Sequence, residues 1–307
     1  MEKDNKFVLV GLQEGASEHI AAPHYSYWKS VARKFFSSKV SIAMLVISIS
    51  IMLLAFIHPM FSNFNPLTDA NQLDRTTWFL RPSLEHWFGT THNGQELFDA
   101  IWFGTRSSLS VALAACAITT VIGVIVGMFW GYSKQLDAIL IEVYNIIANV
   151  PFLLIVMVMV FVLTPSIPTL IFAMSCTSWL GTAYFIRVQV MIIRDREYNL
   201  ASRCLGTSTF KVLINNVLPY LVSVIVTAVA RDVPSFISYE VYLSYQGVGL
   251  GNETQSLGFL IQNYAPYMNS ASYLFWIPVA ISAIISVSLY VVGQALADAS
   301  DPRTHME

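Results

Sequence analysis

Two adjacent charged residues, Arg231 and Asp232, interrupt an apolar run that extends from Tyr220 to Tyr239. At the centre of a bilayer a charged side chain costs about 2.5–3.5 kcal/mol on insertion scales, so each group should contact water or a partner. Neighbouring positions on a helix do not face each other, and we therefore do not expect Arg231 to neutralise Asp232 directly. Pro234 also removes a backbone hydrogen bond, which predicts a bent, polar patch within the run.

This charged patch has two interpretations. It fits a water-filled path through a membrane, and it also fits a structural salt bridge to another helix. Glu240 lies at the end of the same run, where a structural, a coupling and a substrate-facing role all remain open. A secondary transporter or channel that uses Arg231 and Asp232 as an ion or proton relay is the alternative function.

Enzymatic chemistry has little support in this sequence. The histidines form no HExxH pair or other close ligand pair, and the cysteines form neither a metal-binding cluster nor a disulfide framework. There is no GxSxG nucleophile elbow and no GxxxxGK(S/T) phosphate-binding loop. We expect a non-catalytic chain that binds no cofactor and no metal of its own.

The composition predicts a membrane protein. Apolar residues make up 55% of the chain and charged residues 12%, whereas about a quarter of an ordinary soluble domain is charged. The net charge of −2 gives no indication of nucleic acid. An all-α polytopic fold is expected, because several apolar runs reach the roughly twenty residues that cross a bilayer as a helix. The predicted spans, about six in number, are Val40–Ile57, Leu109–Trp130, Ala138–Val162, Leu170–Val190, Tyr220–Tyr239 and Leu274–Ala295.

Basic residues indicate the orientation. They concentrate before the first span and between residues 187 and 211, and are sparse in 58–106 and 241–272. The positive-inside bias therefore places both termini and the loop 197–219 in the cytosol. The predicted divisions are a cytosolic segment 1–39, a first anchor 40–57, an extracellular segment 58–106, a core 107–296 and a cytosolic tail 297–307. The extracellular segment is either a small cap that contacts an external partner or a solvated connector.

Small and helix-breaking residues predict how the spans pack. Gly123 and Gly127 form a GxxxG pair, and Gly131 follows one turn later, so this face allows close approach of another backbone. Pro151 interrupts the third span and should kink it.

The loop Glu197–Pro219 is polar and helix-forming, and it separates two apolar runs. Gly206 should end its first helix in a left-handed conformation, Thr207 and Ser208 can cap a second helix, and Pro219 should begin the next span. Such a loop is either a handle for a soluble partner or an ordinary linker.

Here the chain resembles the membrane-spanning subunits of ABC importers, whose cytoplasmic loop carries Glu-Ala-Ala, then three residues and a glycine, and Leu-Pro further on. The matching positions are Ala201, Gly206, Leu218 and Pro219. The loop departs from the pattern at Leu200, which replaces the glutamate, at Ser202, which replaces the second alanine, and at Asn216, which replaces an apolar residue. Residues 86–109, 240–249 and 299–303 resemble further motifs of the oligopeptide/dipeptide branch, most closely the C-type permeases of Gram-positive oligopeptide systems (Opp/Ami type).

The resemblance implies an ABC importer permease fold with cytoplasmic coupling helices, located in the cell membrane as a non-catalytic subunit. Its implied partners are a sister permease, two cytosolic ATPase subunits that bind ATP and Mg, a lipid-anchored extracellular peptide-binding protein, and the peptide itself. The implied ATPase-coupling residues are Glu197, Leu200, Ala201, Ser202, Leu205, Gly206, Phe210, Leu218 and Pro219. The span that carries Arg231, Asp232 and Glu240 would line the translocation path, and of these only Glu240 matches a family motif.

Overall fold

The computed structural model describes residues 27–62, 64–67, 74–251 and 254–300. Most of the predicted N-terminal segment and the motif at 301–303 therefore lie outside the described residues. The described part is helical, apart from one isolated antiparallel bridge between Thr90 and Glu96. Its α-helices are α1 Tyr27–Phe35, α2 Lys39–Phe61, α3 Leu97–Tyr132, α4 Lys134–Ala148, α5 Phe152–Leu163, α6 Ile167–Arg194, α7 Glu197–Cys204, α8 Thr209–Val212, α9 Leu218–Tyr245, α10 Leu257–Tyr264 and α11 Ser272–Ser300.

Five helices in the described residues are long and apolar enough to cross a membrane: α2, α3, α6, the continuous helix Thr209–Tyr245 and α11. A sixth candidate span is the pair α4 and α5, which is bent by 78° at its break. These elements overlap the predicted spans, so the all-α polytopic architecture is confirmed.

The third predicted span, Ala138–Val162, is two helices instead of one kinked helix. Asn149 is the C-cap of α4, and Pro151 is the N-cap of α5. Proline has no N–H to donate and disfavours helical geometry at the residue before it, so α4 ends there and α5 starts in a new direction.

The second predicted span begins twelve residues too late, because α3 starts at Leu97 and not at Leu109. The span was predicted from its apolar run, and polar residues before Leu109 interrupt that run, so the first turns of the helix were not recognised. In the structure Thr105 donates its hydroxyl to the Ile101 carbonyl and Ser107 donates to the Phe103 carbonyl. A hydroxyl that is satisfied by the preceding turn can be buried within a helix bundle.

Glycines allow α3 to pack directly on the backbone of α6. A Cβ atom added to Gly127 would lie 2.6 Å from the Ala183 carbonyl oxygen, and one added to Gly131 would lie 2.6 Å from the Arg187 carbonyl oxygen. The predicted close approach is confirmed, and it occurs between two helices of the same chain.

Helix α4 is held beside α3 and α6 by polar contacts, although none of its residues is buried. The Asp137 carboxylate pairs with the Arg187 guanidinium, and Trp130 donates its indole N–H to the same carboxylate at 2.9 Å. The guanidinium also lies over the Trp130 ring. Leu140, Ile141, Tyr144 and Ile147 also pack against the cluster of Trp130, Leu180 and Ala183, whereas Ile139, Val143 and Ile146 on the other side of α4 stay exposed.

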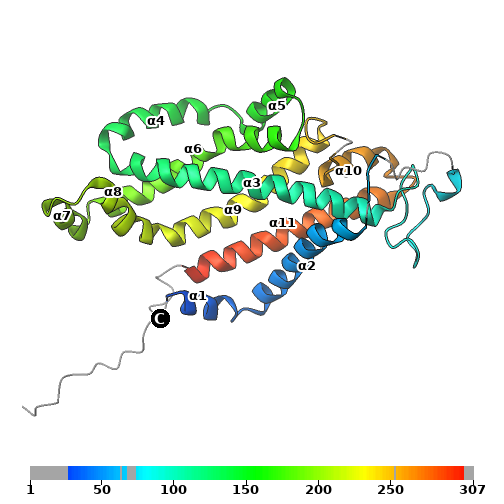
Figure 1. Ribbon diagram of the computed structural model, residues 1–307, viewed down its shortest axis with the longest axis horizontal. Helices are drawn as coiled ribbons and strands as arrows, with labels where there is room; N and C mark the ends of the chain where they lie inside the picture. The colour runs from blue at the N-terminus through cyan, green and yellow to red at the C-terminus, as the bar shows by residue number, and fades with distance from the viewer. Residues whose placement is uncertain (1–26, 63, 68–73, 252–253, 301–307) are drawn as a thin grey trace, which may run out of the picture.

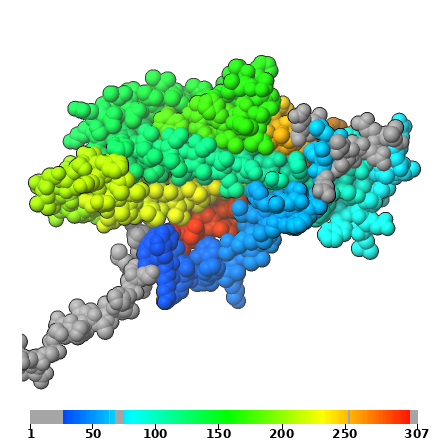
Figure 2. All heavy atoms as spheres, in the orientation of Figure 1, coloured from blue at the N-terminus to red at the C-terminus, as the bar shows by residue number. Residues whose placement is uncertain are grey.

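The long helices run side by side along the length of the molecule (Figure 1). The segment α7–α8 forms the tip of one end, which Figure 2 shows as a projection, and α10 lies near the other end together with residues 74–96. Helix α1 and the end of α11 lie in the half that carries α7 and α8, where the Tyr27 hydroxyl donates to the Ser300 carbonyl. The described chain ends and the predicted coupling loop thus belong to the same half of the bundle.

Residues 74–96 fold against α3, α10 and α11. The Tyr273 hydroxyl donates to the Thr90 carbonyl at 2.8 Å, and His86 pairs with Glu96. The His92 ring stacks on the ring of Tyr267. These contacts give the predicted extracellular segment a defined structure over its described residues.

Candidate coupling and translocation sites

The coupling segment 197–219 begins with the short helix α7, which ends as predicted. Gly206 has φ +78°, the left-handed conformation that glycine adopts without strain. The amide of Thr207 donates to the Ser202 carbonyl, which closes the last turn. Nothing lies within 4 Å of a Cβ atom added to Gly206, so its backbone angle and not a shortage of space favours glycine there.

The second helix of this segment continues into the membrane. Ser208 is the N-cap of α8, but its side chain makes no capping hydrogen bond, contrary to the predicted cap. The four residues of α8 lead through a π-helical turn, Leu213–Val217, directly into α9. Pro219 occupies the first turn of α9, as predicted, and only Leu218 separates it from the π-helical turn.

The π-helical turn is anchored in the bundle. Leu213 and Val217 are buried in an apolar cluster with Val124 of α3 and with Ile186 and Val190 of α6. Single π-turns within α-helices are rare and often occur at functional sites. The joint between α8 and α9 is therefore a buried, irregular helical turn.

An amide network that the sequence analysis missed fixes α7 to the base of α9. Asn216 donates from Nδ2 to Asn199 Oδ1 and to Ser202 Oγ, both at 3.1 Å. Asn199 is completely buried and donates to the Ile193 carbonyl. Two of the three departures from the family pattern, Ser202 and Asn216, are thus hydrogen-bonded to each other. The sequence could have suggested this contact only if the two positions had been considered together.

The outer surface of the segment is apolar. Leu205 is 86% exposed, Phe210 63% and Leu200 44%. Ala201 lies beside Leu200 on the exposed part of α7. Three large apolar side chains are thus exposed on the projecting segment. The remaining predicted residues surround this surface, with Glu197 and Pro219 exposed, Ser202 and Leu218 half-buried and Gly206 exposed.

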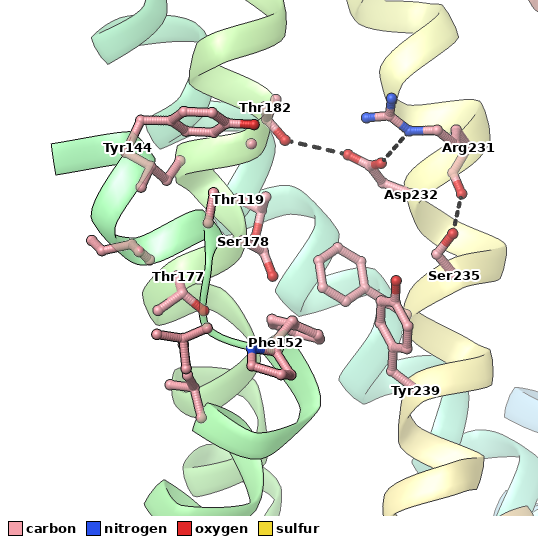
Figure 3. Close-up of a pocket in the computed structure, with 18 residues that line it drawn as sticks. Thr119, Tyr144, Phe152, Thr177, Ser178, Thr182, Arg231, Asp232, Ser235 and Tyr239 are labelled. Atoms are coloured by element: carbon pink, nitrogen blue, oxygen red, sulfur yellow. Dashed lines mark hydrogen bonds and ion pairs between the residues drawn. The ribbon is translucent and has the colours of Figure 1, made fainter. Parts of the chain in front are cut away.

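A cavity of about 500 Å³ lies in the middle of the bundle, between the α4–α5 break, α6 and α9 (Figure 3). Arg231 and Asp232 line it from α9, as Figure 3 shows. Arg231 Nε lies 2.9 Å from Asp232 Oδ1, so the two residues do pair directly, contrary to our expectation. The flexible arginine side chain bends along the helix surface and reaches its neighbour, which simple helical spacing does not capture.

The side chains of Arg231 and Asp232 differ in their exposure to solvent. The Arg231 side chain is 53% exposed, whereas the Asp232 side chain is 14% exposed and lies 3.4 Å from the Thr182 hydroxyl. The guanidinium also lies over the ring of Phe185. The cavity therefore presents a cation whose counter-charge is largely covered.

Glu240 does not line this cavity. Its carboxylate is fully buried near the other end of α9, where it accepts a hydrogen bond from Ser244 at 2.8 Å. The Ser244 hydroxyl in turn lies 3.2 Å from that of Ser256, the N-cap of α10. Glu240 thus belongs to a polar network that joins α9 to α10, apart from Arg231 and Asp232.

Comparison with known proteins identifies the family. Residues 120–306, more than half of the chain, match the model of the family described as "Binding-protein-dependent transport system inner membrane component". The chain belongs to this family of permeases. Residues 26–82 match a second model, the N-terminal TM domain of oligopeptide transport permease C.

Full-length relatives agree with this assignment. The permease is 51% identical to the oligopeptide transport system permease protein AmiD of Streptococcus pneumoniae, over 98% of this chain and 97% of that one. It is 32% identical to the oligopeptide transport system permease protein OppC of Bacillus subtilis, over 97% of each chain. The resemblance found in the sequence motifs is therefore confirmed.

The fold has a counterpart among solved structures. A chain from the inward-facing conformations of the MetNI methionine ABC transporter matches with a TM-score of 0.50 and 18% identity, over 67% of this permease and 96% of that chain. At this identity the match concerns the fold alone, and it supports the ABC permease fold that the sequence predicted.

Proposed function

We propose that this permease forms one half of the translocation path of an ATP-driven importer for oligopeptides in the cell membrane. The names of the full-length relatives support peptide as the cargo. A sister permease would supply the other half of the path, and a lipid-anchored extracellular protein would deliver the peptide. Both termini and the coupling segment lie in the cytosol in this proposal, in accord with the distribution of basic residues.

The observation that carries the proposal is the exposed apolar surface of Leu200, Leu205 and Phe210 on a projecting segment. We assign this surface to one of two cytosolic ATPase subunits, which bind ATP and Mg and perform the hydrolysis. The permease itself catalyses no reaction. Leu200 stands where related permeases carry a glutamate, so apolar contact contributes more of the binding energy here.

The connection between this surface and the cavity suggests how ATP binding would drive transport. The segment α8, the π-helical turn and α9 form one continuous helix, and Arg231 and Asp232 lie in its middle. A rigid displacement of α7 and α8 by the ATPases would therefore move one wall of the cavity. The cavity would open alternately to the two sides of the membrane as ATP is bound and hydrolysed.

Substitutions on the coupling segment test this function. Ala201→Asp places a charge in the proposed contact, and Gly206→Val forces a β-branched residue into the left-handed region at a cost of about 1 kcal/mol or more. Both variants should reach the membrane at normal levels, yet lose peptide uptake and transport-linked ATP hydrolysis.

Two matched variants control for general damage. Gly206→Asn should keep activity, because asparagine tolerates the left-handed conformation. Leu200→Glu should be tolerated if the ATPase groove accepts the family's carboxylate. Wild-type uptake by Ala201→Asp and Gly206→Val, with the ATPases still bound, would refute the coupling role.

The alternative function, an ion or proton relay, rests on the exposed pair of Arg231 and Asp232. A relay needs further titratable groups in sequence along the path. Among the residues that line the cavity, the only other titratable side chains are those of Tyr144 and Tyr239. The arrangement thus favours a binding cavity, and ATP-independent uptake driven by a proton gradient would support the alternative instead.

A further inference from the structure

The central cavity has one group that can bind an anion in a defined orientation. The Nε–H of Arg231 points to Asp232, and the remaining four N–H donors on Nη1 and Nη2 make no hydrogen bond with any described residue. The Asp232 carboxylate restricts the guanidinium, which leaves its forked edge available. Two parallel N–H donors in a plane match the two oxygens of a carboxylate.

Hydroxyl groups on the facing helices lack partners. Thr119 is 1% exposed and lines the cavity, and its hydroxyl makes no hydrogen bond in the described part of the chain. The buried hydroxyl of Thr177, which also lines the cavity, is unpaired in the same way. Both hydroxyl oxygens are fully covered by neighbouring atoms, so they lie behind the wall of the cavity and are not open to a ligand. Arg231 is therefore the polar group on which recognition in the cavity would depend.

Aromatic rings complete the lining. Tyr144 and Phe152 come from the two sides of the α4–α5 break, and Phe236 and Tyr239 come from α9 (Figure 3). Such rings offer apolar contact without selecting one side-chain shape. The lining thus combines one oriented cation with broad apolar walls, which is a suitable set for a ligand with a fixed charge and variable side chains.

We propose that this cavity binds the terminal carboxylate of the transported peptide at Arg231. The inference rests on the peptide-import function proposed above and names the part of the substrate that the permease recognises. A volume of about 500 Å³ lies within the usual range of ligand cavities.

The charges select the carboxyl end over the amino end. An ammonium group would need a free carboxylate, but one oxygen of Asp232 is paired with Arg231 and the other faces Thr182. The guanidinium is the exposed member of the pair. Because the pair is neutral as a whole, its attraction for a carboxylate is moderate, and the peptide can leave again, as passage through a path requires.

The test uses the complete transporter, reconstituted in proteoliposomes with the sister permease, both ATPases and the peptide-binding protein. Uptake is measured for two labelled peptides of the same sequence, one with a free terminal carboxylate and one with a terminal amide. Any preference of the binding protein is the same for every permease variant, so it cancels when variants are compared with the wild type.

Arg231→Leu should lower uptake of the free-acid peptide about tenfold relative to the amide, since hydrogen bonds to charged groups are worth about 1.5–3 kcal/mol. Arg231→Lys keeps the charge but not the fork, and it should lose only part of this preference. Thr227→Val, on α9 but away from the cavity, is the matched control and should change neither.

Two results would overturn the inference in distinguishable ways. If Arg231→Leu and Arg231→Lys lower the uptake of both peptides equally, Arg231 maintains the cavity and binds no terminal carboxylate, while peptide import itself stands. If the wild-type transporter imports neither peptide, the proposed function fails and the carboxylate site fails with it.

Discussion

Replacing Asn216 by alanine should detach α7 from the base of α9. The substitution removes both hydrogen bonds from Asn216 Nδ2 and leaves Asn199 Oδ1 without the donor that the structure shows. Asn199 is completely buried, so water cannot replace the lost donor without opening the contact.

The expected magnitude follows from these contacts. A buried acceptor left unpaired costs about 1–3 kcal/mol, and the second hydrogen bond, to Ser202, adds about 0.5–1.5 kcal/mol. We expect the docking of α7 to weaken by about 2–4 kcal/mol, which raises the undocked population at least tenfold. Ser202→Ala is the matched control and should cost about 1 kcal/mol or less, because the half-buried serine leaves Asn199 paired with Asn216.

Hydrogen–deuterium exchange in the assembled transporter measures this effect directly. Amides of residues 197–204 should exchange faster in Asn216→Ala than in the wild type, whereas those of α10 should be unchanged.

The ATP hydrolysed per peptide imported should rise, because an undocked α7 no longer moves α9. The triple change of Asn199, Ser202 and Asn216 to leucine, alanine and leucine replaces all three polar side chains, while the Ile193 carbonyl keeps its hydrogen bond from the Arg196 amide, and it should restore slow exchange. Unchanged exchange in Asn216→Ala would refute the reasoning.

Three further predictions concern other parts of the molecule. Gly127→Val should lower the free energy of unfolding of the purified permease by about 1–3 kcal/mol, measured by thermal denaturation, because the added side chain overpacks α3 against α6. Gly181→Ala should cause no such loss, because the space around Gly181 is open. A membrane-impermeant maleimide should label Cys204 in inverted vesicles only and an engineered cysteine at position 269 in intact cells only; the reverse pattern contradicts the topology. Burial holds the pKa of His92 below its ordinary value of 6.5, so the unfolded segment binds more protons below that pH. The protection factors of residues 86–96, which correct for the intrinsic pH dependence of exchange, should therefore decrease as the pH falls through 6.5, and His92→Phe should abolish this dependence.

Elements governed by local chemistry were predictable from the sequence. The left-handed Gly206, the helix-starting Pro219 and the close-packing Gly127 each follow from the covalent structure of one residue type, and all three hold in the structure. The apolar runs likewise predicted the spans, because helix length and apolarity are properties of a continuous segment. The start of α3 was misplaced because its polar residues are satisfied within the helix.

The pairings in the two sites depended on side-chain conformation and on packing. Arg231 and Asp232 pair through a bent side chain that spacing along an ideal helix does not represent. Asn216 and Ser202, fourteen residues apart, meet only because α7 folds back on the base of α9.

The sequence by itself thus determined the membrane class, the spans, the position of the coupling segment and the resemblance to ABC importer permeases. The tertiary structure alone decided that the coupling segment continues into the helix lining the cavity, and that Glu240 belongs to a separate buried network. The physical reason is that apolarity and backbone preference act between near neighbours in the chain. A cavity and its unpaired donors arise instead from the way in which distant helices pack together.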